Sequence, residues 1–193
     1  VYQGDIIYQA EDEYGPLDVV DEHDGRLRSL HFGTQARQST MFVARPEELA
    51  LEYTRCMMTA LLFMNADPAR TLMLGLGGGS LVKFMLRWCT DSEVDVAELR
   101  PAVVDVAQRF FSLPVDHDRL RLHIGDGNAF IQQPPAAPWD LILMDLHTSD
   151  GIDDERGGIH NAHSRPGVAH EVRHPRCIDQ VDLDLSPLRE SDT

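Results

Sequence analysis

The stretch TLMLGLGGGS, residues 71–80, leads from an apolar, strand-like segment into a loop with glycine at four of five consecutive positions. A strand that runs into a glycine-rich turn is typical of a loop that brings the backbone close to a bound ligand. The spacing of the glycines and the residues that follow them indicate which ligand to expect. A turn whose glycines serve only the backbone remains an alternative.

The glycine spacing separates three kinds of ligand site. A phosphate-binding P-loop ends in Gly-Lys-Ser/Thr, but the only lysine of the chain, Lys83, lies inside the next helical segment, so this class is excluded. A dinucleotide fingerprint needs a third glycine where Ser80 stands, which weakens an NAD site and leaves it open. The pattern G-x-G-x-G, made by Gly75, Gly77 and Gly79, favours a nucleoside without a pyrophosphate.

Downstream of the loop, strand patterns alternate with helical patterns. Strands are predicted at residues 71–76, 93–99, 120–126 and 139–146. The helical segments between them, 81–88 and 100–111, carry apolar stripes made by Leu81, Phe84, Met85 and Trp88 and by Val103, Val106, Ala107 and Phe110. This alternation predicts a Rossmann-like α/β fold with a doubly wound parallel sheet, whose ligand lies at the carboxyl ends of the strands.

Upstream of the loop, the chain predicts a small β unit and then a helix. Residues 16–32 read as two strands with Asp24-Gly25 in the turn, because that pair tolerates a positive φ. Residues 45–68 predict a helix that begins near Pro46 and ends at Asp67-Pro68. We therefore divide the chain into an N-terminal β unit (1–45), a nucleoside-binding domain (46–149) and a polar, irregular tail (150–193).

Composition narrows the functional classes. A formal net charge of −15 over 193 residues repels phosphate backbones, which argues against nucleic acid as a partner. The N-terminus shows no basic segment before an apolar run, and the longest apolar-rich stretch, residues 56–64, is too short to cross a membrane. We expect a soluble, cytoplasmic protein. Neither a disulfide framework nor a metal site is expected from the cysteines and tail histidines, which are Cys56, Cys89, Cys177, His160, His163, His170 and His174.

Two acids follow successive predicted strands. Glu98 lies at the end of the second predicted strand, which is the first strand after the glycine loop. A carboxylate there can accept hydrogen bonds from both ribose hydroxyls. Asp126 ends the third strand, where it can accept from an adenine amine while Gly127 lets the backbone approach. Either acid alone is often a solvated strand end, but together with the loop they indicate a nucleoside site.

These residues resemble the spermidine synthase family of polyamine aminopropyltransferases, in its spermidine-synthase-like branch. The resemblance runs from about Glu13 to Gly151. It rests on the segments EYGPLDVVD, GRLRSLHFG, QS, EYT, LMLGLGGGS, VAELRPAVVDVAQRFF, LRLHIGDGNAF and WDLILMD, in this order. The ordinary methyltransferase pattern has an acid two residues before the first glycine, whereas this chain has the apolar Met73, as spermidine synthases do.

The resemblance implies a role for each matching residue. Gly75, Gly77 and Gly79 are expected to line decarboxylated S-adenosylmethionine, with Gln38 at the gate of the site. Glu98 is expected to hold its ribose, and Asp126 with Gly127 its adenine. The catalytic carboxylate matches Asp145, while Tyr53 and Asp150 are expected to contact a small cationic amine. No metal is implied.

The chain also departs from the family pattern. Thr54 replaces the histidine that follows the tyrosine, Phe32-Gly33 replaces an Asp-Gly pair, and Asp145 and Asp150 are spaced more widely than usual. The tail after Gly151 is too polar for the remaining strands and helices, so we expect a fold that is incomplete at the C-terminus through truncation, frameshift or divergence. The fourth strand would then be an edge, which favours a homodimer.

Two other functions stay open. One is a methyltransferase that uses S-adenosylmethionine itself, and the other is a nucleoside-binding remnant without catalysis. Aminopropyl transfer from decarboxylated S-adenosylmethionine is the function that the resemblance favours.

Overall fold

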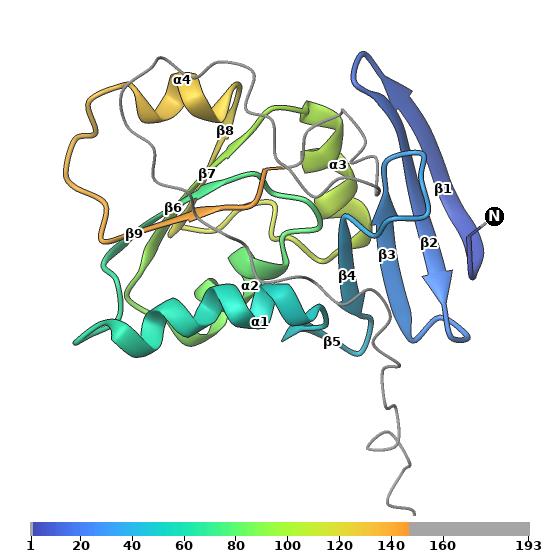
Figure 1. The fold of residues 1–193 in the computed structure, drawn as a ribbon, viewed down its shortest axis with the longest axis horizontal. Helices are drawn as coiled ribbons and strands as arrows, with labels where there is room; N and C mark the ends of the chain where they lie inside the picture. The colour runs from blue at the N-terminus through green and yellow to red at the C-terminus, as the bar shows by residue number, and fades with distance from the viewer. Residues whose placement is uncertain (1, 147–193) are drawn as a thin grey trace, which may run out of the picture. The chain divides into compact units, whose positions relative to one another are not determined.

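The computed structural model describes residues 2–146, which all belong to one compact unit, Val1–Gly151. Its N-terminal part is a five-stranded antiparallel sheet in the order β1-β2-β3-β4-β5 (Figure 1). The strands are β1 Asp5–Asp12, β2 Gly15–Glu22, β3 Leu27–His31, β4 Ser39–Phe42 and β5 Arg45–Leu49. The predicted hairpin is confirmed, since Asp24 and Gly25 lie between β2 and β3 with φ of 57° and 76°.

The second sheet is parallel and has the order β8-β7-β6-β9 (Figure 1). Its strands are β6 Arg70–Leu74, β7 Glu93–Glu98, β8 Leu120–Ile124 and β9 Leu141–Met144. The helices of the unit are α1 Glu52–Met58, the 3-10 helix η1 Thr59–Phe63, α2 Ser80–Trp88, α3 Pro101–Phe110 and α4 Gly127–Ile131. Strand and helix alternate from β6 onward, so the predicted Rossmann-like fold with an N-terminal β unit is confirmed.

The predicted start of the first helix is wrong. Residues 45–49 form the strand β5, which pairs with β4 through Met41 and Leu49, and the helix α1 begins only at Glu52. Pro46 suits this place because β5 is an outer strand and its register with β4 shifts between the pairs Phe42–Arg45 and Met41–Leu49, an irregularity where proline is tolerated. The N-terminal sheet therefore continues to Leu49.

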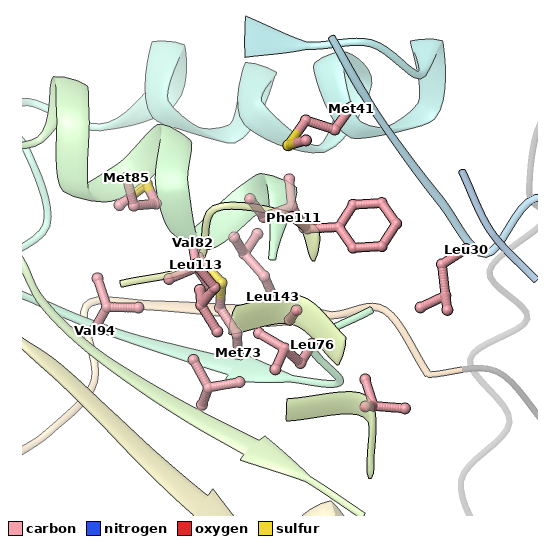
Figure 2. Close-up of a cluster of buried hydrophobic side chains, with 14 of the residues drawn as sticks. Leu30, Met41, Met73, Leu76, Val82, Met85, Val94, Phe111, Leu113 and Leu143 are labelled. Atoms are coloured by element: carbon pink, nitrogen blue, oxygen red, sulfur yellow. The ribbon is translucent and has the colours of Figure 1, made fainter. Parts of the chain in front are cut away.

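One hydrophobic core joins the two sheets. Leu30 and Met41 from the N-terminal sheet belong to the same buried cluster as Phe111, which follows α3 and is fully buried (Figure 2). The parallel sheet contributes Met73, Val94, Val96 and Leu143 to this cluster, and α2 contributes Leu81, Val82 and Met85. On the opposite face of the sheet, Phe130 and Trp139 pack on a smaller cluster made by Leu72, Leu74 and Ala97.

The buried face of α2 is turned relative to the predicted stripe. Leu81 and Met85 are buried as expected, but Trp88 is 55% exposed, and Val82 and Cys89 are buried instead. Trp88 is the last residue of the helix, and its ring lies beside the guanidinium of Arg87 at the surface. In α3 the predicted stripe holds for Val103, Val106 and Ala107, while Phe110 is partly buried.

Candidate active site

The glycine loop connects β6 to α2 at the carboxyl end of the sheet. Gly75, Gly77 and Gly79 all have positive φ, of 92°, 53° and 69°. At Gly75 the need for glycine is also steric, because a Cβ there would lie 2.2 Å from the carbonyl oxygen of Asp145. The loop therefore brings the backbone that follows β6 against the residue that follows β9.

Glu98 contacts the backbone of this loop. It is the last residue of β7 and is 8% exposed. Its Oε2 accepts a hydrogen bond from the N–H of Leu76 (2.9 Å), and its Oε1 accepts one from the N–H of Arg100 (2.8 Å). Burial raises the pKa of Glu98, and the two N–H donors oppose that shift. Each carboxylate oxygen can accept a second hydrogen bond, so the pair of oxygens can still receive two ribose hydroxyls.

Asp126 lies at the start of α4, after β8. Its Oδ1 accepts a hydrogen bond from the N–H of Asn128 (2.9 Å), so the residue caps the helix. The side chain is exposed, whereas the neighbouring Gly127 is buried, and a Cβ added there would lie 3.3 Å from the side chain of Leu74. The capping hydrogen bond gives Asp126 a local structural role. Its predicted contact with adenine stays a proposal.

Tyr53 and Asp145 meet in space although 92 residues separate them. The hydroxyl of Tyr53 in α1 donates a hydrogen bond to Oδ2 of Asp145 (3.0 Å). The N–H of Asp145 donates to the carbonyl of Leu74 (2.9 Å), which extends the pairing of β6 with β9 by one residue. The predicted catalytic acid and a predicted substrate-binding residue thus lie together, next to Gly75.

Gln38 lies on the opposite side of the loop, just before β4. Its carbonyl oxygen is 3.6 Å from the position that a Cβ on Gly77 would take. Its side-chain Oε1 is buried and has no hydrogen-bond partner among the described residues. Ser39 continues the contact, with its hydroxyl 3.3 Å from the hydroxyl of Ser80 at the start of α2. Gln38 therefore contacts the glycine loop through its backbone and carries a buried side-chain acceptor without a partner among the described residues.

Thr54, which stands where the family has a histidine, makes only a local contact. The hydroxyl of Thr54 is buried and donates to the carbonyl of Leu51 (2.6 Å), so it serves the first turn of α1. Asp150 and the tail histidines lie outside the described residues. Within residues 2–146, no group of three or more His, Cys, Asp or Glu side chains could hold a metal ion.

Arg100, which is buried two residues after Glu98, is not among the site residues that the sequence predicts. A signal was present, since an arginine directly before a helix-starting proline stands at the carboxyl end of a strand, where ligand sites form. The described part of the chain also contains no helix that is both long and apolar enough to span a membrane.

The chain was compared with known proteins. No family model matches it. It is 35% identical to the polyamine aminopropyltransferase of Neisseria meningitidis serogroup A over 133 residues, which are 69% of this chain and 48% of that protein. It is 37% identical to the polyamine aminopropyltransferase of Chromobacterium violaceum over 122 residues, 63% of this chain and 46% of the relative. The chain thus spans about half the length of the curated relatives it matches.

The fold gives the same result. A crystal structure described as a "probable spermidine synthase" from Corynebacterium glutamicum matches with a TM-score of 0.65 and 20% identity, covering 74% of this chain and 52% of that one. At this identity the likeness concerns the fold, whereas the sequence matches carry the relationship. Over the matched part of its sequence the chain is similar to the polyamine aminopropyltransferases, and its fold is similar to that of the spermidine synthase structure.

Proposed function

We propose that this chain transfers an aminopropyl group from decarboxylated S-adenosylmethionine to a small cationic amine. The observation that carries the proposal is the hydrogen bond from Tyr53 to Asp145, directly beside the backbone of Gly75. An acid held at the carboxyl end of a parallel sheet, next to a glycine loop, is well placed to act on the reactive end of a nucleoside.

The nucleoside half of the site is proposed from the groups around the loop. Glu98 would accept the ribose hydroxyls with both carboxylate oxygens, and Asp126 with Gly127 would receive the adenine. The buried Oε1 of Gln38 gives independent support, because a buried acceptor without a partner among the described residues calls for a donor from a ligand or water. The co-substrate carries such donors on its ammonium group.

The chemistry requires an amine that has lost a proton. An alkyl ammonium has a pKa of about 10, so its nitrogen carries no lone pair at neutral pH until a proton is removed. Asp145 would attract the cationic amine, hold its nitrogen near the reacting carbon and take up a proton. The nitrogen then bonds to the methylene carbon while the carbon–sulfur bond breaks. The bonding electrons return to sulfur, and methylthioadenosine leaves.

Two residues set the expected strength of amine binding. Tyr53 orients the acid through its hydroxyl, whereas Thr54 turns its hydroxyl toward Leu51 and gives the amine no contact. We therefore expect a high KM for the amine. Asp150, which lies outside the described residues, is proposed as a second contact for the amine.

The proposed setting of this activity is the cytoplasm. The thiols of Cys56 and Cys89 are free, as is usual in a reducing compartment. Association into a homodimer is proposed through β9, an outer strand of the described sheet, where Ile142 and Met144 are exposed.

The test is release of methylthioadenosine from decarboxylated S-adenosylmethionine with putrescine, spermidine or cadaverine as the acceptor. Asp145→Asn should lower turnover on the order of 100-fold while methylthioadenosine still binds. Asp140→Asn is the matched control, because Asp140 precedes the opposite end of β9 and bonds the N–H of Arg70 (2.9 Å). This control should keep its turnover.

The alternatives give different results in the same experiment. Methyl transfer from S-adenosylmethionine would favour a methyltransferase. Firm binding of methylthioadenosine without any turnover would favour a nucleoside-binding protein that lacks catalysis. Unchanged aminopropyl transfer by Asp145→Asn would remove this residue from the mechanism.

A further inference from the structure

The side chain of Arg100 is buried against the turn between β1 and β2, although 88 residues separate it from Asp12. Its Nε donates to Oδ2 of Asp12 (3.1 Å), and its Nη2 donates to Oδ1 of Asp12 (2.8 Å) and to the carbonyl of Gly15 (2.8 Å). This two-pronged contact between a guanidinium and a carboxylate fixes direction as well as distance. Arg100 thereby ties residues 12–15, the β1–β2 turn, to the end of β7.

The turn is itself organised around the same carboxylate. Oδ1 of Asp12 also accepts a hydrogen bond from the N–H of Tyr14 (2.8 Å), within the two-residue connection between the paired residues Asp12 and Gly15. Loss of Arg100 would therefore remove the external partner of the group that shapes the β1–β2 turn.

Two aromatic rings shield the guanidinium from water. Its central carbon lies 4.6 Å from the ring centroid of Phe32 and 5.9 Å from that of Tyr14. A cation between aromatic faces and a carboxylate is held more tightly than an exposed ion pair, because its charge is largely desolvated. Phe32, a departure from the family pattern in the sequence analysis, thus has a defined packing role here.

The backbone of Arg100 serves the proposed nucleoside site at the same time. Its N–H donates to Oε1 of Glu98 (2.8 Å), while Oε2 of Glu98 accepts from Leu76 in the glycine loop. One residue thus connects the β1–β2 turn, the carboxylate of Glu98 and, through Glu98, the glycine loop.

We propose that Arg100 is a positioning residue for ribose recognition, which fixes the orientation of the Glu98 carboxylate by anchoring its own backbone to the β1–β2 turn. This inference rests on the proposed function, because it assigns Glu98 to a ribose. Its consequence is specific: loss of the Arg100 anchor should weaken discrimination between ribose and deoxyribose more than it weakens recognition of the base.

A purely structural role is the competing explanation, and Arg28 provides the matched control. The Arg28 guanidinium binds both oxygens of Asp21 (2.7 and 2.9 Å) and donates to the carbonyl of Phe110 (3.0 Å). Like Arg100, it links the N-terminal sheet to the α/β part, but its contacts do not include Glu98 or Leu76. If both arginines only hold the two parts together, their substitutions should act alike.

The first measurement is the binding of methylthioadenosine and of its 2′-deoxy analogue to the 193-residue chain, by calorimetry. We expect the unchanged protein to prefer the ribose compound by about tenfold or more, as for hydrogen bonds to a charged acceptor. Arg100→Lys keeps the positive charge but cannot make the two-pronged contact with Asp12. It should reduce the preference for ribose to about threefold or less. Arg28→Lys should keep the full preference.

The second measurement needs no ligand. The rate of hydrogen exchange at the Leu76 amide reports on the hydrogen bond that this amide donates to Glu98. Exchange should be at least about tenfold faster in Arg100→Lys than in Arg28→Lys. Arg100→Ala and Asp12→Asn should show the same acceleration and should not add when combined, if both act through one anchor.

The outcomes separate the two proposals. If the unchanged protein binds methylthioadenosine without preference for ribose, the proposal that Glu98 accepts the ribose hydroxyls is contradicted. Hydrogen exchange at Leu76 then still tests whether Arg100 fixes the orientation of the Glu98 carboxylate. A full ribose preference that survives Arg100→Lys overturns the positioning role alone. Equal exchange at Leu76 in the Arg100→Lys and Arg28→Lys variants also overturns it.

Discussion

The side-chain nitrogen of Lys83 in α2 donates a hydrogen bond to the carbonyl of Phe111, the residue that follows α3. The same nitrogen lies 3.3 Å from the sulfur of Met41 in β4. Lys83 is thus a buried amine at the junction of the N-terminal sheet, α2 and α3. Burial lowers the pKa of Lys83 from 10.5 to about 7, and the charge of Glu47 opposes part of that shift.

Replacement of Lys83 should change how stability depends on pH. Between pH 7 and pH 10.5 the unfolded chain binds more protons at this lysine than the folded chain does, so stability rises with pH across this window. Relative to Lys83→Met, the unchanged protein should gain on the order of 3 to 5 kcal/mol in free energy of unfolding over the window. Urea unfolding at a series of pH values measures this difference.

Arg87→Met is the control for that comparison, because Arg87 lies exposed in the last turn of the same helix. Its stability curve should run parallel to that of the unchanged protein. A Lys83→Met curve that is also parallel would show that the folded chain holds Lys83 charged.

Gly75→Ala should destabilise the protein more than Gly25→Ala does. Both glycines have positive φ, 92° and 76°, but a Cβ at Gly75 would meet the carbonyl of Asp145 at 2.2 Å, whereas Gly25 has open space. The backbone strain is therefore shared, and the clash should add on the order of 2 kcal/mol or more to the loss at Gly75. Denaturant unfolding gives both values, and equal losses would contradict the close approach of β6 and β9.

Features that depend on neighbouring residues could be predicted from the sequence. The stripe of Val103, Val106 and Ala107 follows helical spacing, and it is buried as predicted. The order of strands and helices after Gly75 was predictable for the same reason, because each element carries its own periodicity. The placement of Glu98 at the end of its strand followed directly.

Features that depend on distant partners could not be predicted. Residues 45–49 have a proline and two acids that suit a helix start, but pairing with β4 holds them as a strand. The contact of Arg100 with Asp12 joins positions 88 residues apart, and nothing local to either residue indicates it. The same holds for Tyr53 and Asp145, which only the resemblance to a family brought into one site.

As the pH decreases, the affinity for methylthioadenosine should begin to fall at a higher pH than it would with a glutamate of ordinary pKa. Burial raises the pKa of Glu98 above its usual 4.5, so this carboxylate becomes protonated at a higher pH. Only the ionised form offers acceptors on both oxygens to the ribose. Calorimetric titrations from neutral to acidic pH should show this decline in the unchanged protein and a weak, flat profile for Glu98→Gln.

Glu93→Gln is the control for the pH profile. Glu93 begins the same strand and is partly exposed, and it pairs with Arg121 (2.9 Å) at the surface. Its profile should match that of the unchanged protein. A flat profile in the unchanged protein would mean that Glu98 does not receive the ribose.

Tyr53→Phe should separate the orientation of Asp145 from nucleoside binding. The substitution keeps the ring and removes the hydroxyl that donates to Oδ2 of Asp145 (3.0 Å). Because the acid would lose a fixed direction toward the amine, turnover under the proposed function should fall by about tenfold, with methylthioadenosine affinity within about twofold. Tyr8→Phe is the control, since Tyr8 in β1 stacks on Phe110 instead, 4.8 Å between ring centroids. A Tyr53→Phe variant that keeps full turnover would show that Asp145 needs no partner to act, whereas a parallel loss of nucleoside affinity would place Tyr53 in the nucleoside half of the site.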